Sequence, residues 1–511
     1  MPMRTSAAHT VVMAAVAVAL VAPVRATAQN HAPRTSVSRT ADAPPGLAAI
    51  READLRRDME ALAGDAMRGR EAGTLDELRS SAWLAERARA AGLEPAGDDG
   101  TYFQFWAMRR AVTSPASRAS YDGTRLDLDT EAVVTPPVDA TIDAPIVALE
   151  PGTTPDASAA RGKVLVTTLH APANFSGRTK RNDTFIYTLL GLFEEAGRLS
   201  KLDAAAIVVV CDSIADAGFQ FPSTWMRRGE YGIDSTGPRA GPPNEGPPVI
   251  LVRRAPGQRI ASATRFAATL IANRFTQPSV NVIGRIRGTD PKLRDEYVLF
   301  SAHQDHDGVR FPIDGYSIWN GADDNASTSV ALLAIARAWT QHPGRRSALF
   351  VWHGAEERGL LGSKYHAAHP VVPITSIVAV VNGDMIGRNN PDTASLLGSQ
   401  PPHRNSAALV RMAIDANARV SHFAIDSIWD RPAHPEGFYF RSDHVPYAAR
   451  NVPSLFFTTV LHDIYHTPFD EPSRIEYPKL TRMAKWMYAT GWAVSQARER
   501  PAIDPGYKFS R

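Results

Sequence analysis

The stretch SALFVWHGAEERGLLGSKYHAAH (residues 347–369) combines the features that decide the fold. It begins as a continuous apolar run, reaches two consecutive glutamates, and continues through a Gly-rich turn into a segment with helical spacing. Near-continuous apolar strands are typical of parallel sheets, because connecting helices cover both faces of such sheets. The stretch therefore predicts a buried strand that delivers Glu356 and Glu357 to one edge of a parallel sheet.

The same alternation of strand and helix recurs on both sides of this stretch. Three further strand–helix pairs are 297–305 with 327–342, 376–385 with 406–419, and 453–460 with 477–497. Strands that alternate with helices predict an α/β fold with a mostly parallel central sheet covered on both faces, that is, a three-layer sandwich.

The chain divides into segments of different composition. We predict a signal peptide at 1–28, a disordered linker at 29–45, the first part of the α/β domain at 46–111, an inserted mainly β domain at 112–280, the remaining α/β domain at 281–500 and a C-terminal tail at 501–511. The inserted domain is predicted from short β-rich runs that alternate with Gly, Pro and Asp turns.

The N-terminal segment has the features of an export signal. Arg4 precedes an apolar run from Val11 to Val24, and small residues stand at Ala26 and Ala28, where a signal peptidase reads the chain. The run is shorter than the ~20 residues that span a bilayer. A cleaved signal, and hence a secreted or periplasmic protein, is therefore expected.

Composition excludes several classes of partner. The chain has 511 residues, of which 44% are hydrophobic and 21% charged, as in a folded globular protein. Its formal net charge is +3, without a Lys/Arg run of the kind that binds nucleic acid or anionic lipid. We expect no nucleic acid partner and no stable membrane insertion, and the sequence leaves the oligomeric state open.

Acidic residues and histidines follow each strand of the α/β domain at its carboxyl end. They are His303 and Asp305, then Asp323 and Asp324, Glu356 and Glu357, Asp384, and His462, Tyr465 and His466. Each has an ordinary structural explanation by itself; the ADDNAS segment at 322–327, for example, is a good helix N-cap sequence. Their common position favours one shared site, because ligands collect at the carboxyl ends of the strands in such sheets.

The residue types favour a hydrolytic metal site. Histidines and carboxylates, with Cys211 the only cysteine, suit zinc. Two divalent ions need a carboxylate between them, and an aspartate on a helix-capping turn is well placed for that. Asp305 lies two residues after His303, on the same side of the strand, where it is placed to orient the imidazole. Adjacent residues of an extended chain point to opposite sides, so Glu356 and Glu357 are expected to have different tasks.

At these residues the chain resembles the secreted co-catalytic zinc aminopeptidases. That family contains the leucyl and the Streptomyces- and Vibrio-type aminopeptidases and is related to glutamate carboxypeptidase II and the glutaminyl cyclases. The resemblance runs from about Leu47 to Trp492 and includes the segment LAGDAMRGREAGT at 62–74. Region 112–280 resembles a protease-associated (PA) domain. The resemblance implies a zinc exopeptidase fold with two Zn²⁺ per chain.

The resemblance also implies a role for each site residue. It implies His303 and Asp384 as ligands of the first zinc, Glu357 and His466 as ligands of the second, and Asp324 as the bridge between them. Glu356 matches the general base, and Tyr465 matches a donor to the oxyanion. Asp305, which is expected to orient or polarise the His303 imidazole, is the third predicted catalytic residue. Ser442 and Asp443, in the segment RSDH at 441–444, match residues near the substrate pocket.

The implied function is an exported aminopeptidase that hydrolyses the N-terminal residues of peptides with a free N-terminus. Gln304, Thr328 and Gly383 depart from the family's usual residues and put the substrate preference in doubt. A glutaminyl cyclase-like or carboxypeptidase-like member of the same fold is an alternative. A non-catalytic, receptor-like protein is a further alternative, although such a protein would be expected to have lost metal ligands.

Overall fold

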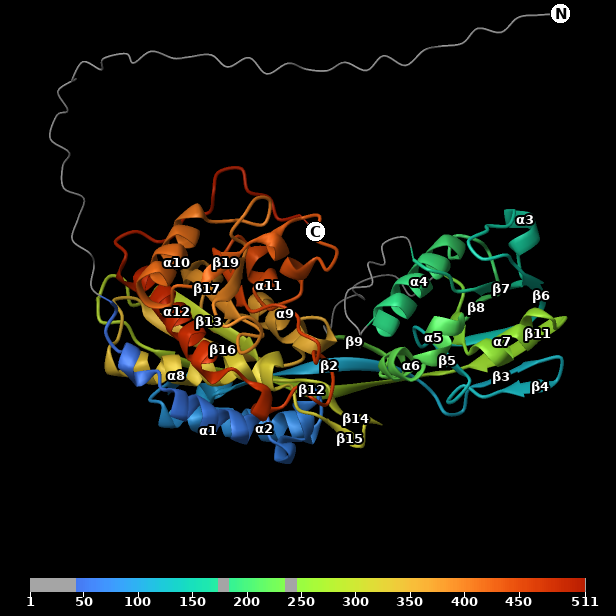
Figure 1. Cartoon of the computed structure of the whole chain (residues 1–511), viewed down its shortest axis with the longest axis horizontal. Coiled ribbons are helices and arrows are strands. Elements are labelled where there is room, and N and C mark those ends of the chain that lie inside the picture. Colours follow the sequence, from blue (N-terminus) through green and yellow to red (C-terminus); the bar gives the residue numbers. More distant parts are fainter. Residues whose placement is uncertain (1–42, 173–182, 235–245, 511) are drawn as a thin grey trace, which may run out of the picture. The chain divides into compact units, whose positions relative to one another are not determined.

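Four buried parallel strands form the centre of the main sheet (Figure 1). They are β16 (Ser347–His353), β13 (Tyr297–His303), β17 (Ile377–Gly383) and β20 (Ser454–Thr458). The computed structural model describes residues 43–172, 183–234 and 246–510. The predicted signal peptide and residues 29–42 of the predicted linker lie outside the described residues.

Antiparallel strands extend this centre on both sides. The order is β19-β18-β20-β17-β13-β16-β12-β2-β9, and β1 pairs with β12. The added strands are β1 (Glu94–Pro95), β2 (Phe103–Thr113), β9 (Glu230–Ile233), β12 (Ala272–Ile286), β18 (Thr393–Leu397) and β19 (Ala424–Asp426). The sheet is therefore mixed, whereas a mostly parallel sheet was predicted. The difference arises because β2 and β12, at the borders of the predicted insertion, are partly exposed and lack the continuous apolar runs of the central strands.

Helices cover both faces of the central strands. One face packs against α1 (Glu52–Leu62), α2 (Leu75–Ala90), α8 (Thr328–Gln341), α10 (Ala407–Val420) and α12 (Tyr477–Gln496). The other face packs against α9 (Leu361–Ala368) and α11 (Val445–Ala448). Helix α8 is buried along most of its length because its sequence is apolar on nearly all sides.

A second sheet lies within the predicted insertion. Its order is β4-β3-β11-β6-β7-β8-β10-β5, and the run from β6 to β10 is parallel. The strands are β3 (Arg118–Tyr121), β4 (Thr124–Leu126), β5 (Ala132–Val134), β6 (Ala140–Ala148), β7 (Val164–Thr168), β8 (Ala206–Val210), β10 (Val249–Val252) and β11 (Arg265–Leu270).

Helices accompany this second sheet, although a mainly β domain was predicted. They are α3 (Ala157–Ala160), α4 (Asp183–Leu199), α5 (Ser213–Ala217), α6 (Gln220–Arg227) and α7 (Arg254–Ala261). Most of them are short, which explains why the β-rich runs dominate the sequence pattern of this region.

One strand of the insertion belongs to the main sheet. Strand β9 pairs antiparallel with β2, with Met108 opposite Ile233 and Ala111 opposite Glu230. Helix α6 ends directly before this strand, so the pairing fixes the position of Arg228 and Tyr231 beside the main sheet. None of the helices in the described part of the chain has both the length and the apolar character needed to cross a membrane.

Candidate metal centre

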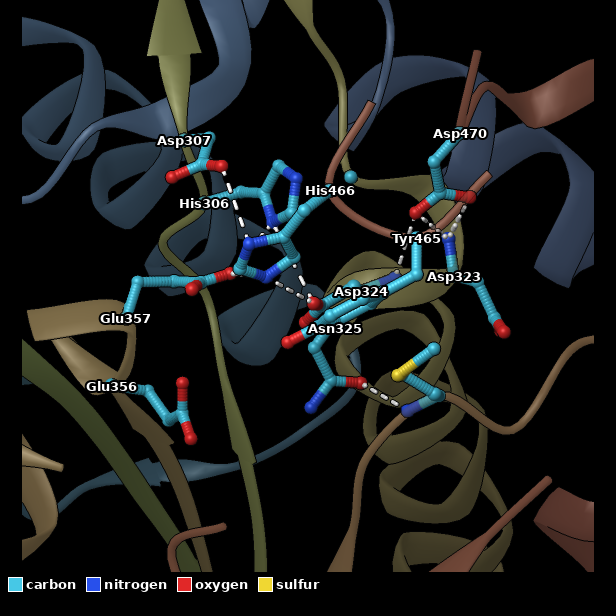
Figure 2. A network of polar contacts seen from close by, with 12 residues as sticks. His306, Asp307, Asp323, Asp324, Asn325, Glu356, Glu357, Tyr465, His466 and Asp470 are labelled. Carbon is cyan, nitrogen blue, oxygen red and sulfur yellow. Dashed lines mark hydrogen bonds and ion pairs between the residues drawn. The ribbon is translucent and has the colours of Figure 1, made fainter. Parts of the chain in front are cut away.

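The loops after the central strands bring histidines and carboxylates together in two groups, the second of which is seen in Figure 2. The first ligand group is His303, Glu356 and Asp384, and the second ligand group is His306, Asp324, Glu357 and His466. Within each group, one ligand atom from every member lies within 4.8 Å of the others. Every residue predicted as a metal ligand falls in one of these groups.

Asp324 faces both groups at once. Its Oδ1 lies 3.2 Å from His303 Nε2, and its Oδ2 lies 3.1 Å from His466 Nε2. His303 Nε2 is also 3.4 Å from Asp384 Oδ1. The two oxygens of one carboxylate thus point into two neighbouring sites, as a bridge between two cations requires.

The turn that carries Asp324 caps α8 through Asn325, whose Oδ1 accepts from Thr328 N–H at 3.3 Å, but its backbone is irregular. Residues Ala322–Ser327 form an irregular turn before α8, in which Asp324 has φ −104° and ψ 95°. The backbone N–H groups of Asp323 and Asp324 donate to the carboxylate of Asp470 at 3.0 and 3.1 Å (Figure 2). Asp323 itself turns away from the groups, because its Oδ1 accepts from Gly387 N–H at 2.6 Å.

Glu356 and Glu357 diverge because they lie in a turn. In an extended chain, adjacent side chains would point to opposite sides, as was expected here. Residues Glu356–Arg358 instead form a 3₁₀ turn shortly after β16. Glu357 Oε1 lies 3.2 Å from His466 Nε2, in the second ligand group. Glu356 Oε2, in the first ligand group, lies 3.8 Å from His303 Nε2, farther than the nearest oxygens of Asp324 and Asp384. The different positions of the Glu356 and Glu357 side chains therefore result from the geometry of this turn and not from the alternation of side chains along a strand.

Asp305 supports the two glutamates through their backbone. Its carboxylate accepts hydrogen bonds from the N–H groups of Glu356 at 3.0 Å and Glu357 at 3.3 Å. His303 Nδ1 lies 3.1 Å from the carbonyl oxygen of Asp305 but 3.8 Å from its carboxylate. The partner that orients the imidazole is thus the backbone carbonyl, whereas the sequence suggested the side chain. Burial raises the pKa of Asp305 to about 6.

Tyr465 lies at the wall of a cavity of about 440 Å³ that also exposes Glu356, Asp324 and Asp384. Its hydroxyl accepts a hydrogen bond from Arg441 at 3.1 Å. Burial raises the pKa of Tyr465 well above its ordinary value, and nearby carboxylates act in the same direction. The phenol therefore stays protonated at neutral pH and retains a proton to donate.

Ser442 and Asp443 are fully buried and do not line this cavity. Ser442 Oγ donates to Asp384 Oδ2 at 2.9 Å and accepts from Asn382 at 2.8 Å. The prediction that Ser442 and Asp443 contact the substrate is therefore corrected. Ser442 instead orients the carboxylate of Asp384 through its hydrogen bond. Burial raises the pKa of Asp443 to about 7.

Asp307 is a supporting residue that the sequence reasoning missed. Its Oδ2 lies 3.4 Å from His466 Nδ1 and so directs the other ring nitrogen towards Asp324 and Glu357 (Figure 2). Arg228, from the end of α6, forms an ion pair with the other oxygen of Asp307. Burial opposes ionisation, but Arg228 and His466 hold the pKa of Asp307 well below its ordinary value. Only the fold brings Arg228 to this position, so no local signal in the sequence could have indicated it.

Arg70 holds the backbone beneath the centre and explains the segment at 62–74. Its guanidinium is fully buried and donates to four carbonyl oxygens. These are Gln304 at 2.7 Å, Leu62 at 3.1 Å, Asn320 at 2.6 Å and Gly321 at 2.9 Å. One side chain thereby ties the loop after β13 to the turn that carries Asp324.

We expect Arg70→Met to lower the free energy of unfolding by about 3 kcal/mol or more, because several buried carbonyls lose a charged donor. Urea unfolding in excess chelator measures this without a contribution from metal. Arg79→Met, on the exposed face of α2, is the control and should change stability by less than about 0.5 kcal/mol. Equal stability of the two variants would contradict the role assigned to Arg70.

The electrostatics of the centre favour cations. Burial opposes protonation of His303 and His466, yet the surrounding carboxylates raise the pKa of both well above the ordinary value. Burial also opposes ionisation of Glu357, but His466 and His306 hold its pKa well below the ordinary value. The buried carboxylates thus favour the protonated, positively charged form of His303 and His466.

Several buried polar atoms of the two groups have no hydrogen-bond partner in the described part of the chain. They are His303 Nε2, Asp384 Oδ1, His306 Nδ1, His306 Nε2 and Glu357 Oε1. A buried polar atom left without a partner is costly, and convergent atoms of this kind are satisfied by a metal ion. Imidazole nitrogens with carboxylate oxygens are a donor set that suits zinc.

The comparisons with known proteins agree with this chemistry. Residues 281–491 match the model of Peptidase family M28. Leucine aminopeptidase 2 of Trichophyton equinum is 27% identical over 195 residues, which cover 37% of this chain and 35% of that protein. Aminopeptidase YwaD of Bacillus subtilis is 26% identical over 264 residues, which cover 50% of this chain and 53% of that protein. The matched segments thus span about a third to a half of these relatives.

Two solved structures share the fold over nearly the whole chain. One is BSAP, a zinc aminopeptidase from Bacillus subtilis, with a TM-score of 0.57 and 18% identity over 90% of this chain and 99% of that chain. The other is an aminopeptidase from Aneurinibacillus sp. strain AM-1, with the same TM-score and 16% identity over 90% of this chain and 97% of that chain. Residues 281–491 are thus similar to Peptidase family M28, and the two solved structures support the α/β fold predicted from the sequence.

Proposed function

We propose that this chain is an exported two-zinc aminopeptidase that removes N-terminal residues from peptides. The observation that carries the proposal is the position of Asp324, whose two oxygens face two separate ligand groups, with Glu356 beside the first of them at the cavity wall. Export is proposed from the signal-like segment at 1–28, and the insertion at 112–280 is proposed to be PA-like.

The proposed ligands form two metal positions that share Asp324. The first metal position is His303, Asp324 and Asp384, and the second metal position is Asp324, Glu357 and His466. Zinc bound there would supply Lewis acidity and would lower the pKa of a water molecule towards neutrality. Ser442 behind Asp384 and Asp307 behind His466 fix the orientation of these ligands.

Glu356 is proposed as the general base. Its carboxylate reaches the cavity, and Asp305 fixes its backbone. Burial raises the pKa of Glu356 well above its ordinary value, because a charged carboxylate is poorly solvated here, and Asp384 and Glu357 act in the same direction. A carboxylate of raised pKa accepts a proton from water more readily and then returns it to the leaving amine.

Tyr465 and Arg441 are proposed to stabilise the oxyanion that develops on the scissile carbonyl. Arg441 donates to the Tyr465 oxygen at 3.1 Å, which helps to hold the phenol at the cavity wall. A donor that is already fixed before reaction costs no reorganisation when charge develops.

An aminopeptidase must recognise a free α-amine, and the carboxylates at the cavity wall suit an ammonium group. We expect acetylation of leucine p-nitroanilide at its α-amine to lower kcat/KM by about 10- to 100-fold or more, because a charge-assisted hydrogen bond of about 1.5–3 kcal/mol is lost. The two substrates are compared with the zinc-loaded protein at equal concentration. Equal rates would contradict exopeptidase activity. A preference for blocked peptides cleaved at the C-terminus would indicate a carboxypeptidase, and cyclisation of N-terminal glutamine would indicate a glutaminyl cyclase.

A further inference from the structure

His306 occupies a buried position against the second metal position. It directly follows Asp305, after the end of β13, and its side chain is fully buried. Its Nδ1 lies 2.8 Å from Glu357 Oε1 and 4.0 Å from Asp324 Oδ2. Within the described residues neither of these facing atoms, His306 Nδ1 or Glu357 Oε1, has a hydrogen-bond partner, although the two lie so close together. Both atoms lie in one group with ligand atoms of Asp324 and His466, all within 4.8 Å of one another, so the four face a common point.

The spacing of the four atoms matches one tetrahedral cation. Zinc bonds of 2.0–2.2 Å at tetrahedral angles place neighbouring ligand atoms roughly 3.3–3.5 Å apart. Four of the six distances between these atoms are 2.8, 3.1, 3.2 and 4.0 Å, on both sides of that value, and none exceeds 4.8 Å. The rings of His306 and His466 meet edge to face, at 5.2 Å and 86°, so they approach the point from different directions (Figure 2).

The backbone around His306 keeps the imidazole in place. The N–H of His306 donates to the carbonyl of Arg70 at 3.2 Å. Gly321 has φ +56°, and a Cβ there would lie 2.3 Å from His306 Cγ. Any larger residue at 321 would displace the ring, so the turn before Asp324 is shaped around this histidine.

We propose that His306 is a fourth protein ligand of the second metal position, which is thereby closed by protein. Structural zinc sites have four protein ligands, whereas catalytic sites have three and keep one place for water. The first metal position offers only His303, Asp324 and Asp384, and it faces Glu356. The two positions therefore differ in affinity and in access. The second position binds its ion tightly, and the first position keeps an open coordination place that faces the substrate and Glu356. This inference rests on the proposed function.

The test is the stepwise loading of the apoprotein with Co²⁺ against a competing chelator, followed by visible absorption and by elemental analysis. The wild type should bind one ion tightly with an intense tetrahedral spectrum and a second ion more weakly. Loss of even an outer-shell partner lowers metal affinity by ~10–100-fold, so His306→Ala should weaken the tight ion by more than about 100-fold. The weaker ion should keep its affinity to within a few-fold.

His306→Asp tests the same assignment with a new ligand, and it should recover part of the lost affinity. His462→Ala is the matched control, because His462 is buried beside the same turn, 3.3 Å from Asp323, outside both ligand groups. If His306→Ala bound both ions as tightly as the wild type, His306 would not be a ligand, whereas the two-zinc proposal would stand. A wild type that binds fewer than two ions would instead overturn the two-zinc proposal. Circular dichroism of the apoproteins checks that the variants fold, and an unfolded His306→Ala leaves the decision to His306→Asp.

Discussion

Glu356→Gln is expected to lower kcat by about 10²- to 10⁴-fold, the usual contribution of a general base. The amide has nearly the same shape as the carboxylate but cannot take up a proton. Glu356 Oε2 lies 3.8 Å from His303 Nε2, farther than the ligand oxygens of Asp324 and Asp384. Both metal positions should therefore stay filled in this variant.

The measurement is kcat on leucine p-nitroanilide together with zinc content by elemental analysis. Glu357→Gln provides the contrast, because Glu357 Oε1 lies only 3.2 Å from His466 Nε2 and its loss should lower the zinc content as well as the rate. A Glu356→Gln protein with normal turnover would exclude Glu356 as the base. A Glu356→Gln protein that has lost zinc would make Glu356 a ligand instead.

Asp324→Ala is expected to have the larger effect on metal binding, because this carboxylate faces both positions. Its removal takes one oxygen from beside His303 and another from beside His466. Since losing an outer-shell group already costs ~10–100-fold in affinity, both ions should weaken by more than about 100-fold, and activity should fall with them. Isothermal titration of the apoprotein with zinc measures the two affinities.

Asp323→Ala is the control for this experiment. The two aspartates are adjacent and buried, but Asp323 accepts from Gly387 and contacts His462 instead of the ligand groups. Its loss should lower stability while leaving two zinc ions bound. If Asp324→Ala weakened only one ion, Asp324 would be an ordinary ligand of one position and not a bridge.

The sequence was sufficient to predict the central strands and to bring the candidate metal ligands together at one edge of the sheet. Strands such as 347–353 are buried on both faces, so their apolar runs indicate the parallel arrangement directly. The carboxyl ends of such strands meet at one edge, which brought Asp324, Glu357 and Asp384 into one prediction. The antiparallel strands β2 and β12 were missed because each is partly exposed and is defined mainly by its partner strand.

Residues that act through distant contacts could not be predicted. Asp307 has a role only because α6 and the loop of His466 both reach it. Ser442 was expected at the substrate, but its position behind Asp384 depends on how β17 and the segment before α11 pack together. His306 could have been suspected from its spacing of three residues after His303, although that spacing alone is common in loops.

The pairing of β9 with β2 has a consequence for protein engineering and for domain exchange. An insertion joined only at its two ends could be replaced by another domain of similar size. Here the inserted segment also supplies an edge strand of the main sheet and Arg228, the buried cation that neutralises Asp307. A substitute domain would leave that carboxylate without the nearer of its two arginines, since Arg358 lies 3.6 Å away, and would leave the β2 edge without its neighbour. We therefore expect a chimera to fold and stay active only when residues 228–233 of this chain are retained and the rest of the predicted insertion is exchanged.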